Sequence, residues 1–180
     1  MKRTTKLKRR EEREKDAARA EEEKRGRAEK FMKAALSQAR LALNKGEVPI
    51  GAVIVMGDKI IARGYNQRES KRLATAHAEM IAIDRACKKI SDWRLTGAEI
   101  FVTLEPCAMC AGAIANARIT TVYFGAYEKK GGACGSVHNV ISGSGLNANV
   151  LCYGGVLEYE CSGLIKNFFE NKRNKMPEQG

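Results

Sequence analysis

Two cysteines of this 180-residue chain are spaced as metal ligands. Cys107 and Cys110 stand three apart at the expected start of a helix, so both sulfurs lie on one face and reach the same ion. Exposed amide groups and the helix dipole at that end favour the thiolate, which is the form that binds metal. The pair alone also suits a redox centre or half of a structural zinc finger. The number of further metal ligands in the sequence decides among these alternatives.

The chain offers few further ligands. A structural zinc site takes four protein ligands, but the sequence has no second Cys-x-x-Cys and only two histidines, His77 and His138. Three ligands, His77 with the two cysteines, leave one coordination position for water. Zinc lowers the pKa of such a water to about 7. The pattern therefore predicts a hydrolytic centre with one Zn²⁺ per subunit.

Glu79 follows His77 by two residues and is the candidate proton carrier. A carboxylate beside the metal can take a proton from water and pass it to a ring nitrogen and a leaving amine. Residues two apart do not share a helix face, so we expect both in the first turn, one on each side of the metal. Singly, His77 would be interpreted as a core histidine and Glu79 as a surface charge. The two motifs together favour the catalytic interpretation because each depends on the other.

The elements that position these residues alternate between strand and helix. Apolar periodicity and β-branched runs predict helices over 31–43, 76–90 and 156–172, and strands over 48–55, 59–62, 99–104, 121–124 and 149–153. A further helix starts at Pro106-Cys107, and the glycine-rich segment 125–148 is mostly loop. This order predicts an α/β fold, a three-layer α-β-α sandwich with a five-stranded mixed sheet. Sites in such sheets collect at the carboxyl ends of strands, where Cys107 falls.

Composition limits the location and the partners. Lysine and arginine total 32 against 21 acids, a net charge of +11, which attracts polyanions such as nucleic acid. The sequence has no apolar run long enough for a membrane span, and its charged opening does not resemble a secretory signal, so we expect a cytoplasmic protein with no membrane partner. The other four cysteines are expected to be reduced thiols without a chemical role, namely Cys87, Cys134, Cys152 and Cys161.

Residues 1–28 carry many charges and few large apolar side chains, and we call them the N-terminal extension. The spacing of Glu21 with Arg25 and of Glu23 with Arg27 suits ion pairs on a helix, so the extension is predicted to be a solvated helix or disordered. Its mixed charge favours a solvated segment over an RNA-binding arm. The folded domain is predicted at 29–176, followed by a tail at 177–180.

The pattern His-x-Glu followed by Pro-Cys-x-x-Cys resembles that of the zinc nucleobase deaminases. Within that group the chain is similar to the tRNA-specific adenosine deaminases from about residue 31 to residue 173. The most specific stretches are 75–79, 102–107 and 131–136. The resemblance implies a cytidine deaminase-like fold, usually as a homodimer. It also implies zinc-dependent conversion of the wobble adenosine in a tRNA anticodon stem-loop to inosine, with Glu79 as the proton shuttle.

The same resemblance implies substrate contacts. Asn66 would hydrogen-bond the base, the Ala78 amide would face the oxygen on zinc, and Val48 would line the pocket. Positions that match RNA contacts of the family are Lys130, Asn147, Phe169 and Arg173. Two departures from the family pattern, at Leu73-Ala74 and at Ala148, bear on RNA contacts at the pocket rim and leave the zinc chemistry untouched.

Two other functions remain open from the sequence. One is a deaminase of free guanine or cytosine, which needs the same metal set. The basic segment 171–175 argues against it, because a free base has no phosphate backbone to attract that charge. The other is a zinc-stabilised RNA-binding or partner subunit without activity, which the presence of Glu79 argues against.

Overall fold

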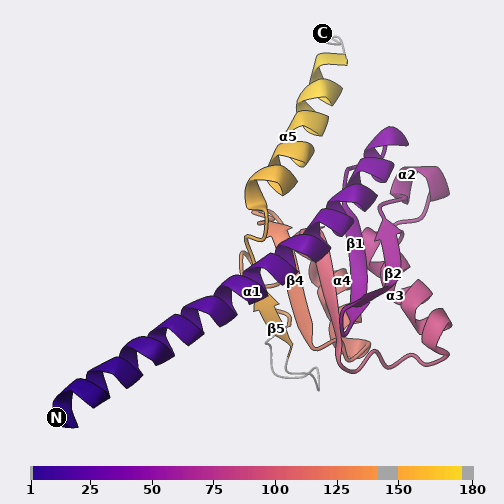
Figure 1. Cartoon of the computed structure of the whole chain (residues 1–180). Helices are drawn as coiled ribbons and strands as arrows, with labels where there is room; N and C mark the ends of the chain where they lie inside the picture. The colour runs from indigo at the N-terminus through magenta and orange to yellow at the C-terminus, as the bar shows by residue number, and fades with distance from the viewer. Residues whose placement is uncertain (1, 142–149, 176–180) are drawn as a thin grey trace.

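The computed structural model describes residues 2–141 and 150–175, which form one sheet with helices on both faces (Figure 1). The five strands are β1 (Gly51–Met56), β2 (Lys59–Tyr65), β3 (Ala98–Leu104), β4 (Thr121–Ala126) and β5 (Leu151–Tyr153). Their order across the sheet is β2-β1-β3-β4-β5. β1 is antiparallel to β2 and β3, whereas β3, β4 and β5 run parallel. The predicted sandwich with a five-stranded mixed sheet is confirmed.

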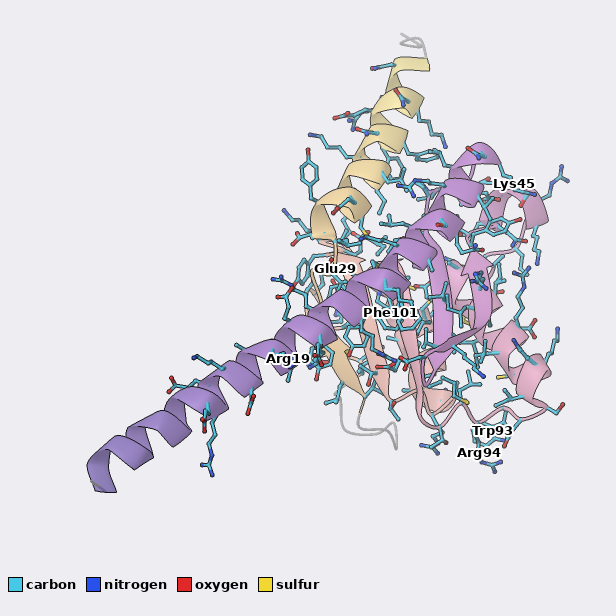
Figure 2. All side chains as sticks on the ribbon, viewed as in Figure 1. Arg19, Glu29, Lys45, Trp93, Arg94 and Phe101 are labelled. Carbon is cyan, nitrogen blue, oxygen red and sulfur yellow. The ribbon has the colours of Figure 1, made fainter. Side chains whose placement is uncertain are left out.

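Two separate cores form because successive strand residues face opposite sides of the sheet. The helices are α1 (Lys2–Asn44), α2 (Arg68–Lys71), α3 (Ala78–Ile90), α4 (Ala108–Asn116) and α5 (Glu158–Lys175). α3 and α4 pack on the face that buries Ile54 and Ile100. α1 and α5 pack on the other face, which buries Val53 and Phe101. Figure 2 shows Phe101 beneath the ribbon of α1, where its ring lies 5.2 Å from that of Phe31.

The helix α1 is longer than the predicted helix over 31–43. It runs unbroken across residue 28, its carboxyl-terminal part crosses the sheet, and its amino-terminal part projects past the sheet edge (Figure 1). Ala28 already packs in the core, together with Phe31 and Met32. The division of the chain into an extension and a folded domain stays a prediction.

Arg25 and Arg27 do not form the ion pairs predicted with Glu21 and Glu23 in the described part of the chain. Arg25 pairs with Glu22 at 2.8 Å instead of with Glu21. Arg27 leaves the helix surface for Glu99 on β3 and for Asp58, to which its Nε donates at 3.0 Å. Glu99 is largely buried, and a shielded carboxylate attracts a guanidinium more strongly than an exposed one on the same helix. The tertiary contact therefore outweighs the local spacing.

Other element boundaries also differ from expectation. β1 begins at Gly51 instead of residue 48, because Pro49 has no N–H to donate to a strand ladder. α3 begins at Ala78 instead of residue 76, and the short helix α2 was not predicted. α5 begins at Glu158 instead of residue 156, and its Phe169 is 43% exposed.

The elements that surround the site gather at one end of the sheet. β3 and β4 are parallel, so their carboxyl ends point the same way, toward the end where α2 and the rising part of α5 lie (Figure 1). None of the helices in the described part of the chain has the length and apolar composition needed to cross a membrane.

Candidate active site

Two helices start at this end of the sheet, and each start carries a predicted metal ligand. His77 precedes α3 with φ −74° and ψ 155°, and Cys107 precedes α4 with φ −73° and ψ 172°. Neither side chain makes the capping hydrogen bond that a residue at this position often makes. Both side chains are therefore free to turn toward each other. The two helix starts also direct unpaired amides and positive dipole ends to one place, which favours anionic groups there.

The three predicted ligands lie together. His77 Nδ1 is 3.8 Å from Cys107 Sγ and 3.5 Å from Cys110 Sγ, and all three ligand atoms lie within 4.8 Å of one another. Zinc bonds of about 2.3 Å to sulfur and 2.0–2.1 Å to nitrogen, at tetrahedral angles, put sulfur and nitrogen about 3.6 Å apart. The geometry and the soft donor set therefore fit zinc. Among the described residues, this is the group of histidine, cysteine and acidic side chains that could hold a metal ion.

Hydrogen bonds among the two thiols and the imidazole favour ionisation of one thiol, and a thiolate is the form that binds a cation. Hydrogen bonds from the Cys110 thiol and from His77 lower the pKa of Cys107 to about 3. The hydrogen bond to Cys107, together with burial, raises the pKa of Cys110. Cys107 is thus the thiolate and Cys110 keeps its proton. A divalent cation would displace that proton, because metal binding and thiol ionisation are linked.

Glu79 lies in the first turn of α3, next to the candidate ligand His77 that precedes the helix. Its side chain is only 4% exposed and lines the same cavity as His77 and Cys107. Burial raises the pKa of Glu79, because a carboxylate loses hydration there. The two residues are not both in the first turn as expected, because His77 is extended and precedes the helix, whereas Glu79 is helical. A carboxyl group that readily holds a proton beside a metal site suits a proton carrier.

A cavity of about 420 Å³ opens over these residues, a volume within the usual range for small-molecule sites. The predicted site residues that line it are Val48, Asn66, His77, Glu79, Cys107, Lys130 and Phe169. Cys110 and Ala78 are buried at the two helix starts. Arg173 lines a neighbouring hollow that shares Lys130 and Phe169 with the cavity. Asn147 and Ala148 lie outside the described residues.

The sequence reasoning gave no role to Glu47, a fully buried carboxylate that contacts the cavity-lining residue Asn66. Asn66 Nδ2 donates to Glu47 at 3.3 Å, and the backbone N–H groups of Glu69 and Ser70 donate at 3.2 and 2.8 Å. Burial raises the pKa of Glu47, but hydrogen bonds from Ser70 and Glu69, together with the charge of Arg68, lower it by more. Because a carboxylate only accepts, it fixes the amide of Asn66 with the nitrogen toward Glu47. The available signal was only that Glu47 directly precedes the apolar residues Val48, Pro49 and Ile50.

A second buried carboxylate without a predicted role, Glu105, lines the cavity itself. It accepts hydrogen bonds from the backbone N–H groups of Glu128, Cys134 and Ser136 at 3.0–3.1 Å, and from the Ser136 hydroxyl. Burial raises its pKa, but the hydrogen bonds lower it by more. Glu105 stood in a motif quoted for the family resemblance, yet its partners come from a distant loop and had no local signal.

The fold and the site define a deaminase, and comparison with known proteins agrees. The chain belongs to the MafB19-like deaminase family, whose sequence pattern matches residues 27–173. The resemblance to the zinc deaminases noted in the sequence, and the cytidine deaminase-like fold that it implied, are confirmed.

Relatives of known activity cover most of the chain. A tRNA-specific adenosine deaminase of Bacillus subtilis is 48% identical over 147 residues, which are 82% of this chain and 91% of that protein. One of Aquifex aeolicus is 44% identical over 148 residues, 82% of this chain and 97% of that protein. A solved structure from studies of A-to-I editing by tRNA deaminases at the wobble position has a TM-score of 0.72 and 43% identity. It covers 74% of this chain and 97% of its own.

Proposed function

We propose that this protein hydrolyses the 6-amino group of the wobble adenosine in a tRNA anticodon, producing inosine and ammonia. The observation that carries the proposal is the position of one buried carboxyl, Glu79, next to a three-ligand metal site on the wall of an open cavity. The names of the relatives from Bacillus subtilis and Aquifex aeolicus support tRNA as the substrate.

We propose one zinc ion per subunit, held by His77, Cys107 and Cys110. When bound, zinc would supply a Lewis acid that makes water nucleophilic at neutral pH. The ligand spacing and the donor set support this metal over calcium or magnesium, which prefer oxygen ligands.

Glu79 would move the protons of the reaction. It would accept one proton from the attacking water and deliver it to the ring nitrogen next to the carbon that bears the amino group. It would then take the second proton from the hydroxyl group added to that carbon and pass it to the amine, which leaves as ammonia. The backbone N–H of Ala78, at the start of α3, would donate to the oxygen that develops charge. Burial of Glu79 keeps bulk water from competing for these protons.

The cavity walls would orient the nucleotide. Asn66, fixed by Glu47, would hydrogen-bond the base, and Val48 would pack against it. RNA contacts would come from Lys130, Phe169 and Arg173, which border the cavity and the neighbouring hollow, and from Asn147. Cations at this rim would attract the phosphates next to the flipped base.

We also propose a homodimer in the cytoplasm, as the family resemblance implies. Light scattering of the purified protein should give twice the monomer mass of 19.8 kDa. A monomeric mass at the concentrations used for activity would exclude the dimer.

The function is tested by side-by-side incubation of the protein with an anticodon stem-loop RNA, free adenosine, guanine and cytosine. Mass spectrometry of the nucleosides should detect inosine from the RNA and little turnover of the free compounds. The Glu79→Ala variant serves as the control for contaminating activity. Turnover of guanine or cytosine without turnover of the RNA would replace this proposal with that of a free-base deaminase.

A further inference from the structure

The segment 127–137, which we call the pocket loop, is held by one carboxylate. It follows β4 and contains no helix or strand, and it combines internal hydrogen bonds, such as that from the Gly132 N–H to the Glu128 carbonyl at 3.0 Å, with contacts to residues outside it. Glu105 Oε1 accepts the backbone N–H groups of Cys134 and Ser136, each at 3.0 Å, and Oε2 accepts that of Glu128 at 3.1 Å. The Ser136 hydroxyl donates to Oε2 as well. Both oxygens are therefore occupied by loop donors from both ends of the segment.

This carboxylate also connects the loop to the metal site. Glu105 stands two residues before the ligand Cys107, and the backbone of Cys107 pairs with Gly132 in an isolated antiparallel bridge. The Ala133 N–H donates to the carbonyl of Pro106 at 2.9 Å. At Gly132 the loop passes so close to the Glu105 carboxyl that a Cβ would collide with it. The pocket loop is thus folded around Glu105.

The loop presents groups to the substrate side of the cavity. Glu128, Lys130 and Gly131 line the cavity, and Lys130 also borders the neighbouring hollow with Lys172 and Arg173. Hydrogen bonds to a buried charged group are stronger than neutral ones, and loss of one leaves buried donors without a partner. Order in the loop therefore depends on the charge of Glu105.

We propose that Glu105 is a positioning residue for the substrate, which holds the pocket loop so that Lys130 meets the RNA backbone, and that it takes no part in proton transfer. This inference rests on the proposed RNA substrate. It separates two buried carboxyls near the metal: Glu79 serves the chemical step, whereas Glu105 serves RNA binding.

The test is the Glu105→Gln variant, assayed with a stem-loop RNA that carries adenosine at the wobble position. Glutamine keeps the shape but offers one acceptor oxygen, so one pair of loop donors meets an NH2 group instead. We expect KM to rise about tenfold, the equivalent of one lost charge-assisted hydrogen bond, with kcat within about twofold of wild type. Zinc content should stay unchanged. A fall in kcat with an unchanged KM would overturn the proposal.

The matched control is Glu99→Gln. Glu99 is a largely buried carboxylate near the start of β3, and it pairs with Arg27 far from the pocket loop. This variant should lower stability and leave KM unchanged. If Glu105→Gln and Glu99→Gln shift KM equally, Glu105 is only structural. Ser136→Ala removes one donor to Glu105 and should raise KM about threefold. This variant perturbs the loop less, so it replaces Glu105→Gln in the test if that variant does not fold.

A double-variant cycle tests the route through Lys130. Lys130→Ala alone should raise KM, and adding Glu105→Gln should raise it less than Glu105→Gln does in the wild-type background. Fully multiplicative effects would contradict a shared route.

Hydrogen exchange separates this inference from the proposed function. Amides of the pocket loop should exchange faster in Glu105→Gln than in Glu99→Gln, with or without RNA. If the loop amides exchange faster in Glu105→Gln but the wild-type protein does not deaminate RNA, only the proposed function is refuted. An unchanged exchange rate, with RNA turned over normally, would refute the positioning role alone.

Discussion

Close contact between β2 and α3 sets the position of His77 and Glu79, and Gly64→Ala tests it. Gly64 lies on β2 beneath the first turn of α3. An added Cβ would lie 2.8 Å from the backbone nitrogen of Ala82 and closer still to the carbonyl oxygen of Ala78. Both are backbone atoms, so no side-chain rotation relieves the clash, and α3 must move away from the sheet.

The size of the movement follows from ordinary contact distances. Restoring about 3.4 Å between the new Cβ and the nitrogen of Ala82 requires a shift of at least about 0.6 Å. Catalytic groups tolerate about 0.5 Å, and a misplacement of about 1 Å costs on the order of 100-fold in rate. Overpacking of this kind also costs about 1–3 kcal/mol of stability. We therefore expect kcat to fall about 10- to 100-fold, with weaker metal binding through His77.

The assay measures turnover of the stem-loop RNA, zinc content by elemental analysis, and the thermal midpoint, with activity taken well below that midpoint. Gly112→Ala is the control, because Gly112 lies in α4 and a Cβ there meets no atom within 4 Å. It should keep activity and gain about 0.5–1 kcal/mol from helix propensity. A Gly64→Ala protein with a lower midpoint but wild-type zinc and turnover would refute the reasoning.

Three further predictions concern the site itself. Glu79→Ala should keep the fold and the zinc and abolish turnover, as checked by circular dichroism, elemental analysis and inosine formation; surviving activity would mean that another group moves the protons. His77→Ala and Cys107→Ala should each lose zinc as well as activity, and full zinc occupancy in either variant would exclude that residue as a ligand. The pKa values of Glu47 and Glu105 are lowered on folding from their ordinary value of 4.5, so their contribution to stability is complete above about pH 4.5 and is lost as the pH falls through the lower folded values. Urea unfolding between about pH 7 and pH 3 should give a flatter profile for Glu47→Gln and Glu105→Gln than for wild type; equal slopes would contradict the lowered pKa values.

The sequence was sufficient to single out the three residues that the structure brings together as a candidate metal site, and for the general architecture. His77, Cys107 and Cys110 were identified from residue type and spacing, because zinc chemistry restricts both. Strand and helix positions followed from apolar periodicity, which reflects burial of one face of each element. The start of α4 at Pro106-Cys107 was also local information, since proline suits a helix start.

Only the tertiary structure decided how these segments meet. Glu47 and Glu105 resemble ordinary acids in the sequence, and their function depends on amides that lie at least 19 residues away along the chain. Arg27 likewise pairs with Glu99, 72 residues away along the chain, and not with Glu23 on the same helix. Sequence spacing describes contacts within one turn of a helix, whereas these partners are brought together by the packing of separate elements. Packing removes water from around these charges. An ion pair between residues far apart in the sequence then becomes stronger than a water-exposed pair between neighbours on one helix.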